Sequence, residues 1–154
     1  MNESKVLFLY TRQDQSRSEE LKDFLRMKLG SHVTLNSIQD TLESNSTLED
    51  ELFQSRCVVL VYSDICEDYL QHDIHEFQKS YVTFDGSIIK AYLLEDSILS
   101  RVVVVYFEKE PDKWIANRMD QRMFHLAGDC FEKLDPALDQ FVQTVKTLTR
   151  KQQK

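Results

Sequence analysis

Arg101-Val-Val-Val-Val-Tyr-Phe107 carries the strongest strand signal in this chain. Its four consecutive valines favour an extended backbone, because β-branched side chains lose rotamer freedom in a helix and pack well on a pleated sheet. Lys5-Val-Leu-Phe-Leu-Tyr10 and Cys57-Val-Val-Leu-Val-Tyr62 are similarly continuous in apolar character. Runs that are apolar on both faces are typical of central strands in a parallel sheet that helices cover.

Helical patterns alternate with these runs. Four apolar residues at helical intervals predict a helix that ends at Gly30, namely Leu21, Phe24, Leu25 and Leu29. Further helices are expected at 47–54, with Thr47 as the cap, at 68–84, at 114–117 and from Asp135-Pro136 onward. Residues 87–99 are expected to form a second helix or a broken continuation of the helix before them. Shorter strands are expected at 32–35 and 123–126. This alternation predicts an α/β fold, a flavodoxin-like three-layer sandwich with about five parallel strands and helices on both faces.

Length and charge narrow the class of protein. The 154 residues fit a single domain, expected at 1–149, followed by a frayed basic tail at 150–154. With 19 Lys and Arg against 26 Asp and Glu, the net charge is −7, which opposes binding to nucleic acid or to an anionic membrane. No apolar run reaches the ~20 residues of a membrane helix. Three cysteines without a C-x-x-C pair favour a cytoplasmic location.

The familiar cofactor sites of flavodoxin-like folds lack their residues here. The turn after the first strand contains no glycine for a phosphate group, and Tyr10 and Thr11 stand where a phospho-receiver has its acidic pair. His72 and His75 form the densest group of metal-ligand types, yet the pattern favours a solvated helix face. Ser63 is expected to cap a turn, since no nucleophile elbow surrounds it. We therefore expect no cofactor and no metal.

Charge is unevenly distributed along the chain. Residues 37–76 contain ten acids and one base, Arg56, so this segment carries −9 and the remainder +2. Such a segment is either a solvated face or an acidic surface that docks a basic partner. The sequence alone leaves both interpretations open.

Two of the strand motifs resemble known signalling domains. Lys5-Val-Leu-Phe-Leu-Tyr-Thr11, followed by a polar and acidic turn, resembles the first box of SEFIR and Toll/interleukin-1 receptor (TIR) domains. Ser55-Arg-Cys-Val-Val-Leu-Val-Tyr-Ser63 resembles the strand after the second helix in both families. The C-terminal third looks like the corresponding part of SEFIR domains, which occur in interleukin-17 receptors and their cytosolic adaptor. It consists of the late strand to Phe107, a polar turn with Pro111 and then Met123-Phe-His-Leu-Ala-Gly-Asp129. The tryptophan-containing third box of TIR domains is not evident.

The SEFIR resemblance implies a cytoplasmic, non-enzymatic adaptor-type module for interleukin-17-like signalling and innate immunity. Such a module binds other SEFIR or TIR-like domains, homotypically or heterotypically, and a weak homodimer is compatible with it. The resemblance leaves open whether the chain is a soluble adaptor, a whole protein or the cytosolic part of a receptor. The sequence departs from the family pattern at Glu43-Ser-Asn-Ser46, where TIR loops carry Pro-Gly, and it lacks a Trp in the second helix. The resemblance implies binding through the loop at 38–46, the helix at 49–54 and the acidic start of the next helix. The expected partner-binding residues are Asp40, Glu43, Asn45, Glu49, Asp50, Glu51, Gln54, Glu67 and Asp68.

The alternative function is catalytic. Some TIR domains, which this chain also resembles, hydrolyse NAD with a Glu on the helix after the third strand, and Glu76 in His75-Glu-Phe77 falls near that position. Hydrolysis would also require a pocket that stabilises a ribosyl cation and excludes water, which one carboxylate does not provide. Glu76 is therefore the candidate catalytic residue of this alternative only.

Overall fold

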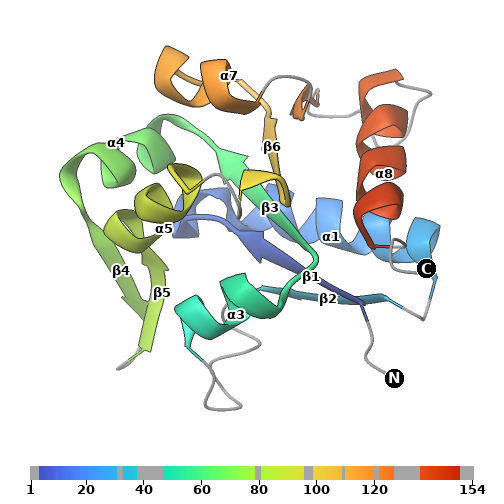
Figure 1. Ribbon diagram of the computed structural model, residues 1–154, viewed down its shortest axis with the longest axis horizontal. Helices are drawn as coiled ribbons and strands as arrows, with labels where there is room; N and C mark the ends of the chain where they lie inside the picture. Colours follow the sequence, from blue (N-terminus) through green and yellow to red (C-terminus); the bar gives the residue numbers. More distant parts are fainter. Residues whose placement is uncertain are drawn as a thin grey trace.

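A five-stranded parallel sheet organises the protein. The computed structural model describes residues 4–30, 33–37, 47–78, 81–95, 99–108, 110–119, 122–126 and 136–149. The strands lie in the order β2-β1-β3-β6-β7 (Figure 1), which is the flavodoxin-like order 2-1-3-4-5 when they are counted along the chain. They are β1 (Ser4–Leu9), β2 (Val33–Ser37), β3 (Cys57–Tyr62), β6 (Val102–Tyr106) and β7 (Met123–His125). The predicted fold class is confirmed.

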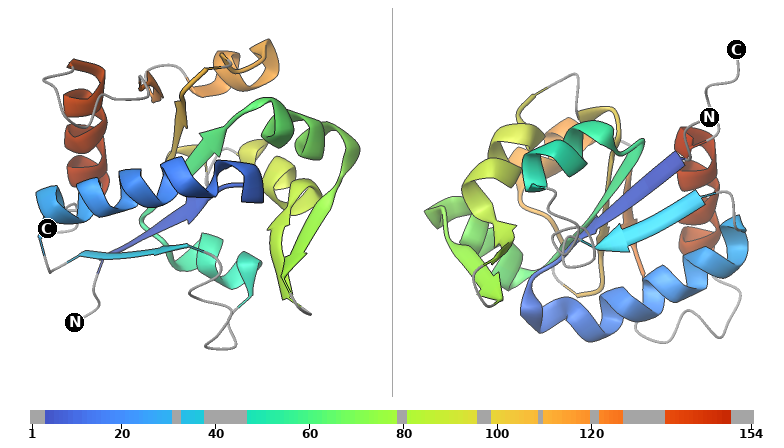
Figure 2. Two further views of the ribbon diagram at one scale, coloured as in Figure 1. Left: turned by 180° about the vertical axis from the view of Figure 1, so that it is seen from behind. Right: turned by 90° about the horizontal axis from the view of Figure 1, so that it is seen from below.

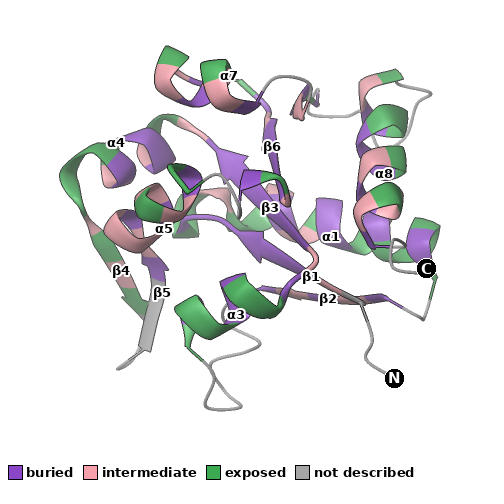
Figure 3. Ribbon diagram, in the orientation of Figure 1, coloured by how far each residue is buried: buried purple, intermediate pink, exposed green. Residues whose placement is uncertain are grey.

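The three β-branched and apolar runs form the centre of the sheet. β3 lies between β1 and β6, with Val58 opposite Leu7 on one side and Val102 on the other. All six residues of β3 are buried, as expected for a strand covered on both faces (Figure 3). β7 is the short edge strand predicted from Met123 to Leu126.

Helices cover both faces of the sheet (Figure 2). On one face α1 and α8 pack over Val59 and Val61 of β3, and on the other α3, α4, α5 and α7 pack over Val58 and Leu60. A short 3₁₀ helix, η1, follows the carboxyl end of β1. The bounds are η1 (Arg12–Asp14), α1 (Gln15–Leu29), α3 (Leu48–Gln54), α4 (Asp64–His72), α5 (Gly86–Leu93), α7 (Lys113–Met119) and α8 (Pro136–Thr149).

The expected helix over 68–84 is confirmed only as far as His72 and is wrong beyond it. α4 ends at His72, and Asp73 then adopts the left-handed conformation with φ 56°, which stops the helix. The chain continues as an antiparallel pair of strands, β4 (His75–Gln78) and β5 (Tyr81–Asp85), with a bulge between Glu76 and Phe77. This β4–β5 hairpin forms its own two-stranded sheet.

The junction from β5 to α5 requires a glycine. A Cβ at Gly86 would overlap the backbone carbonyl oxygen of Tyr69, so α5 packs directly against α4 at this point. Asp85 caps α5, because its carboxylate accepts hydrogen bonds from the backbone N–H groups of Ser87 and Ile88, both at 3.1 Å. The predicted second helix after Gly86 is thereby confirmed, although it ends at Leu93.

Two of the segments predicted from the sequence cannot be compared with the structure. The predicted loop residues 38–46 and the predicted basic tail at 150–154 lie outside the described residues. Among the helices that the structure describes, none is long and apolar enough to cross a membrane.

Candidate interaction surface

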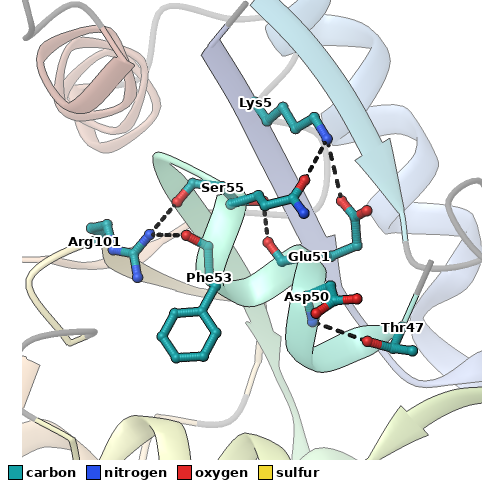
Figure 4. Close-up of polar contacts among 8 residues, drawn as sticks. Lys5, Thr47, Asp50, Glu51, Phe53, Ser55 and Arg101 are labelled. Carbon is teal, nitrogen blue, oxygen red and sulfur yellow. Dashed lines mark hydrogen bonds and ion pairs between the residues drawn. The ribbon is translucent and has the colours of Figure 1, made fainter. Parts of the chain in front are cut away.

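The N-terminal end of α3 is built as the sequence predicts. Thr47 Oγ1 accepts a hydrogen bond of 3.1 Å from the backbone N–H of Asp50 (Figure 4), so Thr47 is the cap. The first turn carries three acids, Glu49, Asp50 and Glu51, which the positive end of the helix dipole stabilises. Leu48 and Leu52 are buried against the sheet and fix the orientation of this short helix, leaving Glu49 and Asp50 exposed.

The C-terminal end of α3 is held by an arginine from a distant part of the chain. One guanidinium nitrogen of Arg101 donates hydrogen bonds to the carbonyl oxygens of Phe53, at 3.0 Å, and Ser55, at 2.6 Å (Figure 4). The Ser55 hydroxyl donates to the carbonyl of Glu51 at 2.7 Å. These donors satisfy carbonyl groups that the end of a helix leaves without intrahelical partners. The backbone of Phe53 is therefore fixed by the residue that directly precedes β6.

An exposed aromatic side chain stands beside the acids of α3. Phe53 is 64 % exposed, and its ring meets the ring of Tyr92 edge to face, with centroids 5.7 Å apart. Burial raises the pKa of Tyr92, the nearby charges of Glu49 and Asp50 raise it further, and Arg101 opposes them. Glu49, Asp50, Phe53 and Tyr92 thus form one patch across α3 and α5, which we call the acidic–aromatic surface.

The structure separates the predicted partner-binding residues into three groups. Glu49, Asp50, Gln54 and Asp68 are exposed, as a docking role requires. Asp40, Glu43 and Asn45 lie outside the described residues. Glu51 and Glu67 are buried, with 4 % and 8 % exposure, and the expectation that they face a partner is corrected.

Glu51 and Glu67 are buried because each has partners inside the protein. The Glu51 carboxylate lies 3.9 Å from the Lys5 ammonium group, which also donates a 3.1 Å hydrogen bond to the side-chain oxygen of Gln54. Glu67 accepts hydrogen bonds from the Tyr62 hydroxyl at 2.8 Å and from the Trp114 indole N–H at 3.0 Å. Gln71 donates to the same carboxylate.

Glu67 links three elements of the fold. Its donors come from β3, α4 and α7, while the backbone N–H of Asp112 donates to the Tyr62 hydroxyl oxygen at 3.3 Å. Burial, followed by the hydrogen bond to Glu67, raises the pKa of Tyr62 well above its usual value. A buried carboxylate surrounded by donors stabilises packing and is shielded from a partner.

The carboxyl ends of β1 and β3 form the position where flavodoxin-like folds bind ligands. There the Ser63 hydroxyl donates to the Asp14 carboxylate at 2.6 Å and accepts from the backbone N–H of Cys66 at 3.2 Å. Ser63 therefore caps the helix α4, where the sequence predicted the cap of a turn. The Thr11 hydroxyl donates to the same carboxylate at 3.2 Å. The adjoining hollow, near Glu108, has a volume of only about 50 Å³, against several hundred for a typical small-molecule site.

Glu76 lies on β4 and not on a helix, because α4 ends before it. Its carboxylate accepts a 2.8 Å hydrogen bond from the backbone N–H of Arg12 and a 2.9 Å hydrogen bond from the Tyr69 hydroxyl. The Arg12 guanidinium donates to the carbonyl of Phe77 at 2.6 Å. These contacts attach the β4–β5 hairpin to η1, which is a structural role for Glu76.

The two candidate metal-binding histidines occupy different elements. His72 is in the last turn of α4, where its ring lies 3.1 Å from Asp68, and His75 is in β4, 3.2 Å from Asp85. The solvated helix face predicted for this pair applies only to His72, since the helix does not reach His75. Within the described ranges, no three His, Cys, Asp or Glu side chains are grouped so that they could hold a metal ion.

Comparison with known proteins returned no match: no family model, no curated protein and no solved structure matches this chain. The SEFIR resemblance therefore rests on the sequence motifs, and the fold rests on the observed strand order.

Sequence reasoning identified α3 but not the aromatic part of the surface. Phe53 follows the buried Leu52 and is rotated about 100° from it around the helix, so its exposure follows once Leu52 is assigned to the core. Its contact with Tyr92 joins residues 39 positions apart and has no local signal. The contact of Trp114 with Glu67 joins residues 47 positions apart and likewise has no local signal.

Proposed function

We propose that this chain is a protein-interaction module of the SEFIR or TIR-like kind, acting at the cytoplasmic side of receptor-proximal, interleukin-17-like signalling. It binds another domain of this kind through the acidic–aromatic surface. The class of module is inferred from the strand motifs. The binding surface is inferred from the exposed residues of α3, which is the helix that the resemblance implies for binding.

The observation that carries the proposal is the exposed ring of Phe53 beside the exposed acids Glu49 and Asp50. Large exposed apolar side chains contribute most when a partner covers them, and aromatic residues are enriched among those that dominate binding energy. The acids at positions 49 and 50 favour a partner face with Arg or Lys side chains, and they steer its approach. A rigid backbone at Phe53, held by Arg101, lowers the entropy lost on binding.

The experiment compares two double charge reversals on opposite faces of the sheet. Glu49→Lys with Asp50→Lys changes the acidic–aromatic surface, whereas Glu20→Lys with Asp139→Lys makes the same change in net charge on exposed positions of α1 and α8. The probes are the immobilised SEFIR domains of an interleukin-17 receptor and of its adaptor. Glu51 stays unchanged because it is buried.

We expect both the unmodified protein and the control variant to bind at least one probe. The variant at positions 49 and 50 binds at least about tenfold more weakly, the equivalent of about 1.4 kcal/mol, because like charges now face each other. Matching melting curves for all three proteins show that the fold is intact. The proposal is overturned if the unmodified protein binds neither probe, or if the reversal at positions 49 and 50 leaves binding unchanged.

A further inference from the structure

The two most exposed large apolar side chains in the described part of the chain lie on opposite faces of the sheet. Met27 is 75 % exposed and lies in the last turns of α1, while Phe53 is 64 % exposed and lies on α3. Helix α1 covers the face that α8 shares, and α3 covers the other face (Figure 2). Both positions point away from the core, so the described part of the chain leaves these side chains open to another molecule.

The surroundings of Met27 carry the charge opposite to that around Phe53. Arg26 and Lys28 flank Met27 and are the bases of the last turn of α1. Lys146 is the base of the last turn of α8, and the C-terminal ends of the two helices lie side by side (Figures 1 and 2). We call Arg26, Met27, Lys28 and Lys146 the basic end.

Internal contacts position Arg26 and Lys28 without burying them, while Lys146 is half-buried. Arg26 pairs with Asp23 at 3.0 Å, where both side chains are more than half exposed, and the Lys28 ammonium group lies 5.3 Å from the centre of the Phe24 ring. Asp23 offsets one positive charge, so the basic end keeps an excess of bases. An exposed pair of this kind is weak and can be exchanged for a partner carboxylate.

We propose that the acidic–aromatic surface of one copy of this chain docks onto the basic end of a second copy. This inference rests on the proposed function, since it assigns an occupant to the same surface. Met27 inserts beside the rings of Phe53 and Tyr92, where a thioether makes favourable contacts with aromatic edges. Arg26, Lys28 and Lys146 face the carboxylates at positions 49 and 50.

Charge also decides the symmetry of the contact. Two acidic–aromatic surfaces repel each other, and so do two basic ends, which disfavours a two-fold dimer made from one surface. A contact between different surfaces on opposite faces of the sheet is head-to-tail. It leaves one free surface of each kind on every pair, so a third copy can add.

The test is the mass of the protein by sedimentation velocity across a concentration series in about 0.15 M salt. At this ionic strength the Debye length is about 8 Å, which screens the long-range repulsion between copies of net charge −7. Two variants each remove one surface, Phe53→Ser and Met27→Ser. Phe77→Ser is the matched control, because Phe77 is also exposed, at 53 %, but belongs to neither surface.

We expect the unmodified protein and Phe77→Ser to grow beyond two chains as concentration rises, and each of the other variants to remain monomeric. An equimolar mixture of Phe53→Ser and Met27→Ser stops at two chains, because only one pair of intact surfaces remains in it. The proposal is overturned if the unmodified protein stays monomeric or stops at a dimer. It is also overturned if Met27→Ser assembles like the unmodified protein, or if Phe77→Ser loses assembly.

The same variant separates this inference from the proposed function. Met27→Ser keeps the acidic–aromatic surface intact, so its binding to the receptor and adaptor probes reports on the proposed function alone. Retained probe binding together with unchanged assembly of Met27→Ser contradicts only the self-association. Loss of probe binding in Glu49→Lys with Asp50→Lys supports the proposed function whatever the assembly state is.

Discussion

Arg101 and Phe53 are 48 residues apart in sequence, yet the guanidinium group of the first fixes the backbone of the second by a 3.0 Å hydrogen bond to its carbonyl oxygen. The same nitrogen atom bonds the carbonyl of Ser55. Arg101, the residue just before β6, thus determines where α3 ends and where the exposed aromatic ring stands. The stability of the core and the geometry of the acidic–aromatic surface are linked through this one side chain.

Replacing Arg101 by Met tests that link. The substitution keeps the apolar stem of the side chain and removes both hydrogen bonds, so two carbonyl groups lose a charged donor. We expect a loss of about 1.5–3 kcal/mol in the free energy of unfolding, measured by urea denaturation. We also expect weaker binding at the acidic–aromatic surface. Lys113→Met is the control, because Lys113 is exposed and its loss should change stability by less than about 0.5 kcal/mol. Equal stability of the two variants would contradict the role given to Arg101.

Glu67 is the second buried group that connects distant elements. Glu67→Leu removes the acceptor for the buried Tyr62 hydroxyl and for the half-buried indole N–H of Trp114. We expect a loss of about 2–4 kcal/mol in the free energy of unfolding, because unsatisfied buried donors are costly. Glu67→Gln keeps an acceptor oxygen and should lose less. The measurement is urea denaturation, followed by tryptophan fluorescence, and a smaller effect of Leu than of Gln would contradict this account.

The fold was predictable where the chemistry is local. Runs such as Val102 to Tyr106 are β-branched along their whole length, and Thr47 is followed three residues later by the amide that it caps. The helix predicted over 68–84 was wrong beyond His72, because the spaced aromatic residues of this stretch fit helical and strand periods alike. In the structure the helix ends because Asp73 adopts the left-handed conformation, and the chain after it forms strands.

The candidate site was only partly predictable, because charge type is visible in a sequence and burial is not. Glu49 and Glu67 both belong to the acidic segment, and nothing nearby in sequence distinguishes the exposed one from the buried one. The burial of Glu67 depends on Trp114, which lies 47 residues later in the sequence and donates a hydrogen bond to its carboxylate. Tyr92 likewise joins Phe53 only through the packing of α5 beside α3.

Two buried cysteines predict how stability depends on pH. Burial raises the pKa of Cys57 from its ordinary value of 9.0 to about 12 and also raises the pKa of Cys66. A group with a raised folded-state pKa contributes stability that is complete below the unfolded-state pKa and is lost as pH rises through the folded-state value. We therefore expect the free energy of unfolding to fall between about pH 9 and pH 12, by up to about 1.4 kcal/mol per pH unit for each thiol.

Urea denaturation at pH 7, 9 and 10.5 measures this dependence. Cys57→Val retains an apolar side chain of similar volume and removes the ionisable group, so its stability should fall less steeply above pH 9 than that of the unmodified protein. Tyr62, whose pKa is also raised by burial, continues to contribute in both proteins. Identical slopes for the two proteins would contradict the assignment to Cys57.

Glu76 provides the test of the catalytic alternative. Its carboxylate is engaged by the Arg12 amide and the Tyr69 hydroxyl, and the hollow at the carboxyl ends of β1 and β3 is lined by other residues and has a volume of about 50 Å³. We expect purified protein incubated with NAD to release no nicotinamide, as measured by chromatography of the reaction mixture. Glu76→Ala should instead lower the melting temperature, because Arg12 and Tyr69 lose their acceptor and the β4–β5 hairpin loses its attachment to η1. Nicotinamide release that disappears in Glu76→Ala, with the fold retained, would assign Glu76 to catalysis and contradict the structural role given to it.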